Sequence, residues 1–210
     1  MRIRLTFSKT PAMRYTGHLD LHRAWERTFR RALLPLAYSQ GFHPQPRLNL
    51  ACALPLGITS QCELLDAWLD PPQPVEQVLA TLVTATPPGI QITHIEEITE
   101  RQPALQTQVT AAEYTVTLLD PQSDLEPRLA ALLASPSLPR QRRGKDYDLR
   151  PLIEILLPLS PDASGLQRFH LRLSARESAT GRPEEVLSAL DIPLESTRIH
   201  RTALILHSDP

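Results

Sequence analysis

The sequence contains only two cysteines, Cys52 and Cys62, among its 210 residues. A structural zinc site needs four ligands and an iron–sulfur cluster needs at least three thiolates, so these two residues alone can form neither. Nothing indicates export, and structural disulfides are rare in reducing compartments. We therefore expect both cysteines to be small, buried, apolar side chains.

Motifs that bind nucleotides or activate nucleophiles are also missing. Glycine is scarce, with seven residues, and GxGxxG, GxxxxGK[ST], GxSxG and HExxH do not occur. His18 and His22 have the i, i+4 spacing that can hold a metal on a helix, but no third ligand follows them at the spacing of a zinc protease. We predict no cofactor, no metal and no catalytic residue, and an enzyme is the less favoured class.

Long apolar runs are absent as well. No stretch approaches the roughly 20 apolar residues that a membrane-spanning helix needs. Residues 1–5 alternate charged and apolar side chains, which is typical of a strand rather than of a signal peptide. We expect a cytoplasmic protein without membrane contact.

Charge is distributed unevenly, although the formal net charge is only −1. Residues 1–50 contain nine basic and two acidic residues, a net charge of +7. Residues 51–139 contain two basic and eleven acidic residues, a net charge of −9. Residues 140–210 contain eleven basic and ten acidic residues, a net charge of +1. Because polyanion binding depends on the local field, the basic N-terminal segment favours RNA as a partner.

Hydrophobic periodicity in the first half predicts the order strand, helix, strand, strand, helix, strand. The first helix has an apolar residue at every fourth position and ends before a proline; its stripe is Leu21, Trp25, Phe29 and Leu33. The expected elements are strands at 2–8, 48–54, 63–69 and 90–95 and helices at about 17–34 and 75–85.

The second half repeats this order with a longer middle. The expected elements are strands at 113–119, 169–175 and 198–207, an apolar segment at 152–159, and helices at 125–134 and about 182–190. A βαββαβ unit forms an antiparallel sheet with both helices on one face, the ferredoxin-like fold. The predicted fold class is α+β, with two tandem ferredoxin-like (βαββαβ) domains with antiparallel sheets, at 1–98 and 111–210, and a polar linker at 99–110.

Arginines gather on the exposed side of the first predicted helix. Arg23, Arg27 and Arg30 lie on one face, away from the apolar stripe. This pattern is compatible with an ordinary solvated face. It also suits phosphate binding, since a guanidinium binds phosphate through two parallel hydrogen bonds.

A polar, aromatic loop follows this helix, and Pro44 and Pro46 restrict the residue before each of them to extended conformations. One interpretation is a turn packed by its own aromatic side chain. The other is a binding loop that stacks on unpaired bases and contacts a phosphate. Its candidate binding residues are Tyr38, Phe42, His43 and Arg47.

A second basic cluster lies at 140–150, around a tyrosine at position 147. It is either a flexible solvated hairpin or a clamp that closes on nucleic acid. Its candidate phosphate-binding residues are Arg140, Arg142, Arg143, Lys145 and Arg150.

Several motifs together resemble a known bacterial family. They are the residues 18–21 before the arginine-rich helix, the segment 34–44, the segment 53–57, and shorter matches at 110–114, 148–151 and 181–183. The sequence resembles the radical-SAM-linked family of unknown function, whose members occur alone or fused behind a radical SAM domain. Members commonly carry a basic or imidazole group where Gln45 stands. Further motif residues are His18, Asp20, Ser39, Gln40, Gly41 and Asp148.

The resemblance implies a radical SAM partner that performs the chemistry. Combined with the basic N-terminal segment, it predicts an accessory RNA-binding protein that acts with a radical SAM enzyme in modification or maturation of tRNA or rRNA. One alternative is a metal-free RNA endonuclease of tandem ferredoxin-like type, with His18 or His43 as general base. Another is a protein-interaction module without nucleic-acid binding.

Overall fold

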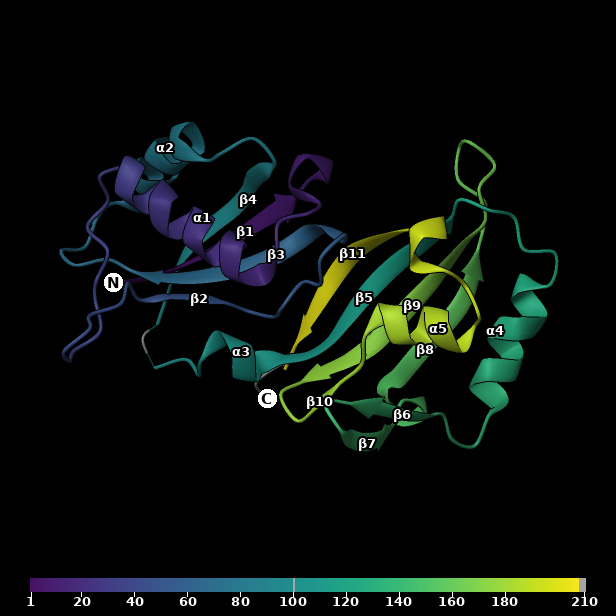
Figure 1. Cartoon of the computed structure of the whole chain (residues 1–210). Coiled ribbons are helices and arrows are strands. Elements are labelled where there is room, and N and C mark those ends of the chain that lie inside the picture. The colour runs from purple at the N-terminus through teal and green to yellow at the C-terminus, as the bar shows by residue number, and fades with distance from the viewer. Residues whose placement is uncertain (100, 208–210) are drawn as a thin grey trace. The chain divides into compact units, whose positions relative to one another are not determined.

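The structure is a computed structural model that describes residues 1–99 and 101–207 (Figure 1). The chain divides into two compact units, Met1–Gln108 and Val109–Pro210. Both units contain helices and antiparallel strands, so the α+β class predicted from the sequence is confirmed. No helix in the described ranges is long and apolar enough to cross a membrane.

The N-terminal unit has a four-stranded antiparallel sheet in the order β4-β1-β3-β2. Its elements follow one another as expected, with a short helix added at the end. They are β1 (Arg2–Lys9), the 3-10 helix η1 (Pro11–Met13), α1 (His18–Arg31), β2 (Leu48–Leu50), β3 (Thr59–Trp68), α2 (Val75–Ala85), β4 (Ile90–Ile98) and α3 (Leu105–Gln108).

The two faces of this sheet are chemically different. Ile3, Ala67 and Leu48 are paired across β1, β3 and β2, so they share the face that packs against α1 and α2 in the hydrophobic core. Arg2 is paired with Trp68, one residue along each strand, so these two share the opposite face. We call this second face the open face of the N-terminal unit.

A buried ionic cluster lies on the open face. Arg2 and Arg4 of β1 both bind the carboxylate of Asp66 on β3, at 2.5 Å (Nη2–Oδ2) and 2.7 Å (Nε–Oδ1). All three side chains are buried. Arg2 also donates to the main-chain carbonyls of Gln102 (2.7 Å) and Pro103 (3.0 Å), so part of the expected linker segment 99–110 is attached to this sheet.

The C-terminal unit has the strand order β11-β5-β9-β8, with the short β10 also paired to β9. A hairpin of its own, β6–β7, precedes β8 and accounts for the longer middle of this half. The elements are β5 (Val109–Leu118), α4 (Leu125–Ala134), β6 (Pro139–Arg142), β7 (Lys145–Asp148), the 3-10 helix η2 (Arg150–Leu152), β8 (Ile153–Leu159), β9 (Arg168–Arg176), β10 (Ala179–Thr180), α5 (Pro183–Ala189), the 3-10 helix η3 (Leu194–Ser196) and β11 (Thr197–Leu206).

The end of α1 differs from the prediction. The helix stops at Arg31, and Leu33, expected in the apolar stripe, is exposed with φ 55°. The amide of Leu34 donates to the carbonyl of Phe29, and that of Leu33 donates to Arg30. This is the Schellman arrangement, in which a residue with positive φ reverses the chain after a helix. Leucine performs the reversal here, and hydrophobicity alone therefore placed it wrongly in the core.

Two further expectations about the N-terminal unit are corrected. The strand predicted over 48–54 ends at Leu50, because the ladder to β3 closes with the amide of Ala51 bonded to Leu64. Cys52 and Cys62 are free thiols, as expected, but both are only half-buried. The thiol of Cys52 donates a weak hydrogen bond to the carbonyl of Ala53, with 3.6 Å between Sγ and O, so this side chain has a polar contact.

Candidate nucleic-acid interface

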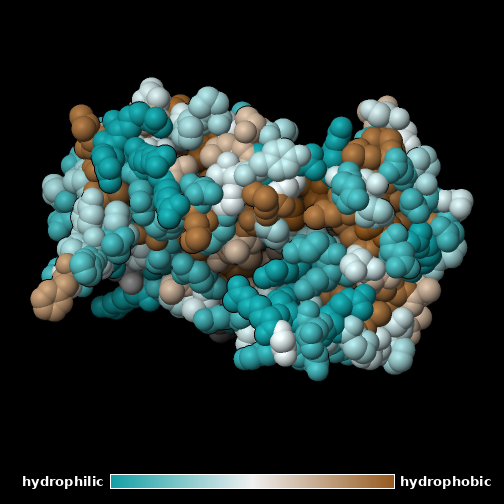
Figure 2. All heavy atoms as spheres, viewed as in Figure 1, coloured by the Kyte–Doolittle hydropathy of each residue, from teal (hydrophilic) through white to brown (hydrophobic). Residues whose placement is uncertain are grey.

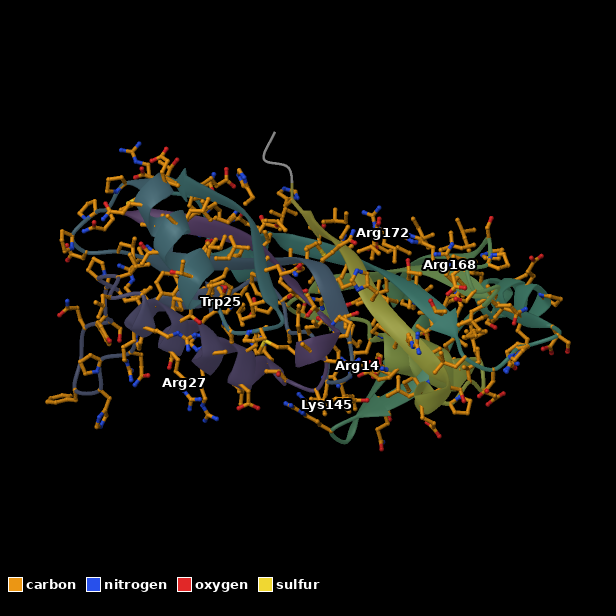
Figure 3. The ribbon with its side chains drawn as sticks, turned by 90° about the horizontal axis from the view of Figure 1, so that it is seen from above. Arg14, Trp25, Arg27, Lys145, Arg168 and Arg172 are labelled. Carbon is orange, nitrogen blue, oxygen red and sulfur yellow. The ribbon has the colours of Figure 1, made fainter. Side chains whose placement is uncertain are left out.

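Helix α1 separates its apolar and basic residues onto opposite sides. Leu21, Trp25 and Phe29 are buried against the sheet, whereas Arg23, Arg27 and Arg30 are exposed. Trp25 lies on the sheet side of the helix and Arg27 points away from it (Figure 3). Hydrophilic residues predominate over α1 (Figure 2), although Leu19 in its first turn is also exposed. The sequence-predicted stripe Arg23, Arg27 and Arg30 is called the arginine face below.

Only one member of the arginine face has a protein partner. Arg23 lies 3.3 Å from Asp20, a solvent-exposed pair of a kind that adds little stability. The guanidinium groups of Arg27 and Arg30 have no hydrogen bond or ion pair with any residue that the structure describes. Neighbouring Arg31 differs, because its guanidinium donates to the carbonyl of Ala85. Two like charges thus stand side by side without neutralisation.

Both ring nitrogens of His22 in α1 are used within the protein. His22 Nδ1 lies 3.1 Å from Glu26 and its Nε2 lies 3.1 Å from the carbonyl of Leu48, so both ring nitrogens have protein partners. His18 is half-buried at the first turn of the helix. Within residues 1–99 and 101–207, no group of three or more potential metal ligands occurs.

The loop after α1 is a small hairpin closed at its base. The amide of Ser39 donates to the carbonyl of Gln45 at 2.8 Å, and the amide of Gln45 donates to the hydroxyl of Ser39 at 3.0 Å. Tyr38 and Pro46 form a β-bridge below this pair. Gly41 at the tip has φ 135°, a conformation that side-chain-bearing residues rarely adopt.

Aromatic side chains of this loop face solvent. Phe42 is fully exposed and Tyr38 is half exposed. His43 is also exposed, and none of the three contacts another ring or cation in the described ranges. Phe42 therefore does not pack the turn from inside, which was the alternative interpretation of this loop, and its ring faces are accessible.

Arg47 is not part of the arginine face and lies on the opposite side of the sheet. It begins the return to β2, and its guanidinium lies 4.6 Å from the centre of the Trp68 ring. Since Trp68 belongs to the open face, the sheet separates Arg47 from the outer side of α1, which covers the other face. Arg47 and the arginine face, all predicted to contact phosphates, thus occupy two surfaces.

A cavity of about 430 Å³ opens beside Arg47 on the open face. The loop supplies Ser39 and Gln45, the strands supply Arg2, Asn49 and Trp68, and Gln102 closes the far side. Sequence reasoning missed the cavity, because Trp68 was expected only as part of a strand and Gln102 as linker. A charged residue, Asp66, and an aromatic residue, Trp68, stand two positions apart on β3 and so share one face. This spacing was the signal in the sequence that could have indicated a polar site there.

The second basic cluster folds as the β6–β7 hairpin. Arg142 pairs with Lys145, and the two turn residues, Arg143 and Gly144, have φ 52° and 76°. Positive φ at both positions defines the type I′ turn that two-residue hairpins prefer. The cluster therefore forms a β-hairpin with a two-residue turn.

Two arginines of this cluster are occupied by protein acceptors. Arg142 binds Glu185 at 2.5 Å, donates to the carbonyl of Thr180 at 3.0 Å, and lies 4.8 Å from the Tyr147 ring. Arg150 donates to the carbonyls of Leu133 and Ile153. Both guanidiniums therefore serve mainly to attach the hairpin to the rest of the C-terminal unit.

The remaining cluster residues divide between structural and solvent-facing roles. Asp148 accepts hydrogen bonds from the amides of Leu138 and Arg150, which lower the pKa of its carboxyl group. Arg140 is partly buried and donates to the carbonyl of Pro139. The side chains of Arg143 and Lys145 are exposed at the turn and have no hydrogen bond or ion pair in the described part of the chain. They are the two cations of the cluster whose donors face water.

A family model matches residues 2–183 of the chain; its description is "Uncharacterized protein conserved in bacteria (DUF2344)". The chain belongs to this family. The bacterial family of unknown function expected from the motifs is thereby confirmed, and the link to radical SAM enzymes stays a prediction. No curated protein matches the chain.

Solved structures resemble the chain only distantly. An H/ACA ribonucleoprotein bound to a substrate RNA containing 2′-deoxyuridine has 11% identity and a TM-score of 0.48, and a Cbf5–Nop10–Gar1 complex has 10% and 0.48. Each match covers 96% of this chain, which spans about half of the matched chain, 47% and 48%. An unknown protein from Galdieria sulphuraria matches over 99% of this chain, with 12% identity and a TM-score of 0.28.

Proposed function

We propose that the protein is an RNA-binding accessory protein that presents an RNA to a radical SAM enzyme for modification or maturation. The RNA part rests on this chain's own surface, and the enzyme partner rests on the resemblance described above. The proposal includes the tandem ferredoxin-like architecture, because both units follow the strand order of that fold, with every neighbouring pair antiparallel.

The observation that carries the proposal is the pair of unpartnered guanidiniums, Arg27 and Arg30, on the arginine face. Like charges at this spacing on a helix repel each other by a few tenths of a kcal/mol. A bound polyanion reverses this cost, because each phosphate accepts two parallel N–H bonds from a guanidinium. Arg31, whose donors are directed to Ala85, shows that the helix can also satisfy an arginine internally.

The loop tip supplies the second element of an RNA site. Phe42 and His43 offer exposed ring faces, and base–aromatic stacking contributes about 1–3 kcal/mol per base. Because the loop follows α1 directly and is closed by hydrogen bonds between Ser39 and Gln45, its tip is held in a defined geometry. Phosphates on α1 and unpaired bases at the loop tip would be bound by one continuous segment of the N-terminal unit.

The test is fluorescence anisotropy of a labelled single-stranded RNA with the full chain over a series of salt concentrations. The double variant Arg27→Ala/Arg30→Ala should bind more weakly and flatten the slope of log K against log salt by about 1.4, that is about 0.7 per lost contact. The matched control Arg176→Ala/Arg198→Ala removes two exposed positive charges from the C-terminal unit and should leave the slope unchanged.

Equal slopes for the two double variants, or no RNA binding at low salt, would exclude the proposal. Co-purification of a radical SAM protein tests the partner separately, and a complex that survives nuclease treatment without any RNA affinity would favour the protein-interaction alternative. RNA cleavage that depends on His18 or His43 would favour the endonuclease alternative.

A further inference from the structure

The cavity on the open face of the N-terminal unit has no role in the proposed RNA contacts of α1. It lies on the other side of the sheet, and its about 430 Å³ falls within the range of pockets that bind small molecules. Its walls come from three separated segments: the base of the loop at Ser39 and Gln45, the strands at Asn49 and Trp68, and Gln102. The site is therefore built by the tertiary fold.

The charge of the cavity favours an anion. Asp66 is the one carboxylate of the buried cluster, and it is shared by the two guanidiniums of Arg2 and Arg4, which leaves an excess positive charge beside the cavity. No acidic residue lines the cavity. Apart from Asp66, the acid that follows in register on this face is Glu96, which stands opposite Arg4 on β4, across β1 from the cavity.

Arg47 adds a second cation with its donors unused. Its side chain is exposed and has no hydrogen bond or ion pair with any described residue. Trp68 holds the guanidinium in place, because the cation lies 4.6 Å from the ring centre, and Arg2 contacts the same ring at 5.0 Å. A guanidinium that rests on an aromatic ring keeps its N–H edge for a phosphate and offers its outer plane to a flat group.

The rest of the lining can recognise a planar polar group. The side-chain amides of Gln45, Asn49 and Gln102 have no hydrogen-bond partner within residues 1–99 and 101–207. Each amide can donate and accept at once, which matches the edge of a nucleobase. An inorganic anion could accept from the amide NH2 groups but would make no use of the amide oxygens, which need a donor such as a base N–H.

From these features we infer that the cavity binds one nucleoside monophosphate, with the phosphate on Arg47 and the base edge on the amides of Gln45 and Asn49. The nucleotide is either a free molecule or the 5′-phosphorylated end of an RNA strand. The second source rests on the proposed RNA-binding function, and the first is independent of it.

Calorimetric titration of the full chain with AMP, CMP, GMP and UMP tests the inference directly. At least one of them should bind, and the matching nucleoside and inorganic phosphate should each bind at least about tenfold more weakly, because each lacks one half of the contacts. Absence of heat with all four nucleotides at millimolar concentration overturns the inference, and so does inorganic phosphate that binds as tightly as the best nucleotide.

Substitutions assign the binding to the cavity. Arg47→Ala should weaken nucleotide binding at least about tenfold. The affinity of Arg47→Lys should lie between those of Arg47→Ala and the unaltered protein, since an ammonium group cannot form the planar, two-bond contact of a guanidinium. Gln45→Ala, at an exposed position, should change the preference among the four bases. The control Arg176→Ala/Arg198→Ala, which removes two exposed positive charges from the C-terminal unit, should leave nucleotide affinity unchanged. Circular dichroism melting establishes that each variant is folded, and unchanged affinity in a folded Arg47→Ala protein overturns the assignment.

Competition separates the two sources. A 5′-phosphorylated RNA oligonucleotide that displaces the bound nucleotide, when the 5′-hydroxyl form does not, identifies the strand end as ligand. No displacement by either form identifies the free nucleotide. If nucleotides fail to bind while RNA binds through Arg27 and Arg30, only the cavity inference falls. If a nucleotide binds and RNA does not, only the proposed function falls.

Discussion

Arg2 and Asp66, separated by 64 positions in the sequence, form a buried ion pair with Nη2 and Oδ2 2.5 Å apart. Asp66 is fully buried and Arg2 nearly so. Arg2 belongs to the basic N-terminal segment that suggested polyanion binding, yet its guanidinium is used in a buried ion pair beside the open-face cavity. The same carboxylate also binds Arg4. Two of the nine basic residues counted in the first fifty are therefore structural.

The first prediction concerns this cluster. Asp66→Asn should destabilise the protein by about 3–5 kcal/mol, because it leaves two buried guanidiniums without a counter-charge. Urea unfolding at neutral pH, followed by circular dichroism, measures the change. The control Glu96→Gln removes an exposed carboxylate on the same sheet face, and its midpoint should stay close to that of the unaltered protein. Equal midpoints for the two variants would show that the cluster contributes little.

The second prediction concerns the loop tip. Phe42→Ala should reduce affinity for single-stranded RNA by about 1–3 kcal/mol, the contribution of one stacked base, as measured by fluorescence anisotropy. Stability should change by less than about 0.5 kcal/mol, because the ring is fully exposed. Val83→Ala, on the exposed side of α2, is the matched apolar control and should alter neither quantity. RNA affinity that is insensitive to Phe42→Ala would remove this ring from the interface.

The third prediction separates two neighbouring arginines of the β6–β7 hairpin. Arg142→Ala should lower stability by about 1–2 kcal/mol, because Glu185 and the carbonyl of Thr180 lose their donor in a partly exposed pair. Arg143→Ala, at the exposed turn, should leave stability unchanged and weaken RNA binding. Parallel urea unfolding and RNA titration test both variants. The reverse pattern, with RNA affinity lost in a stable Arg142→Ala protein, would contradict the structural role of Arg142.

The fourth prediction concerns pH. Hydrogen bonds from the amides of Leu138 and Arg150 favour the charged form of Asp148 in the folded state, so its pKa there lies below that of the unfolded chain. Its stabilising contribution is therefore fully present above the unfolded pKa and is lost as pH falls through the folded pKa. Asp148→Asn should lower the urea midpoint at pH 7, and the difference from the unaltered protein should shrink on acidification. A difference that is constant with pH would contradict this linkage.

Local pattern determined the secondary structure well. The helix predicted over 125–134 has those bounds in the structure, and so does the one predicted over 75–85, because an apolar face repeating near 3.6 residues and a flanking proline are properties of short segments. The end of α1 was placed wrongly, since the positive φ of Leu33 depends on the chain reversal that follows. Family membership was likewise a matter of sequence, through motifs that run along most of the chain.

The sequence by itself therefore determined most of the elements, their order and the presence of a basic N-terminal segment, but not α3, which lies in the predicted linker, or β10. Only the tertiary structure decided which cations face water. Arg4 meets Asp66 and Arg142 meets Glu185 across long sequence separations, whereas Arg27 and Arg30 meet no described partner. Counting charged residues along the sequence gives the formal charge of a segment, but not whether each charge has a partner. Whether a charge is neutralised depends on a partner brought within a few ångströms by the fold, and so does the cavity beside Arg47.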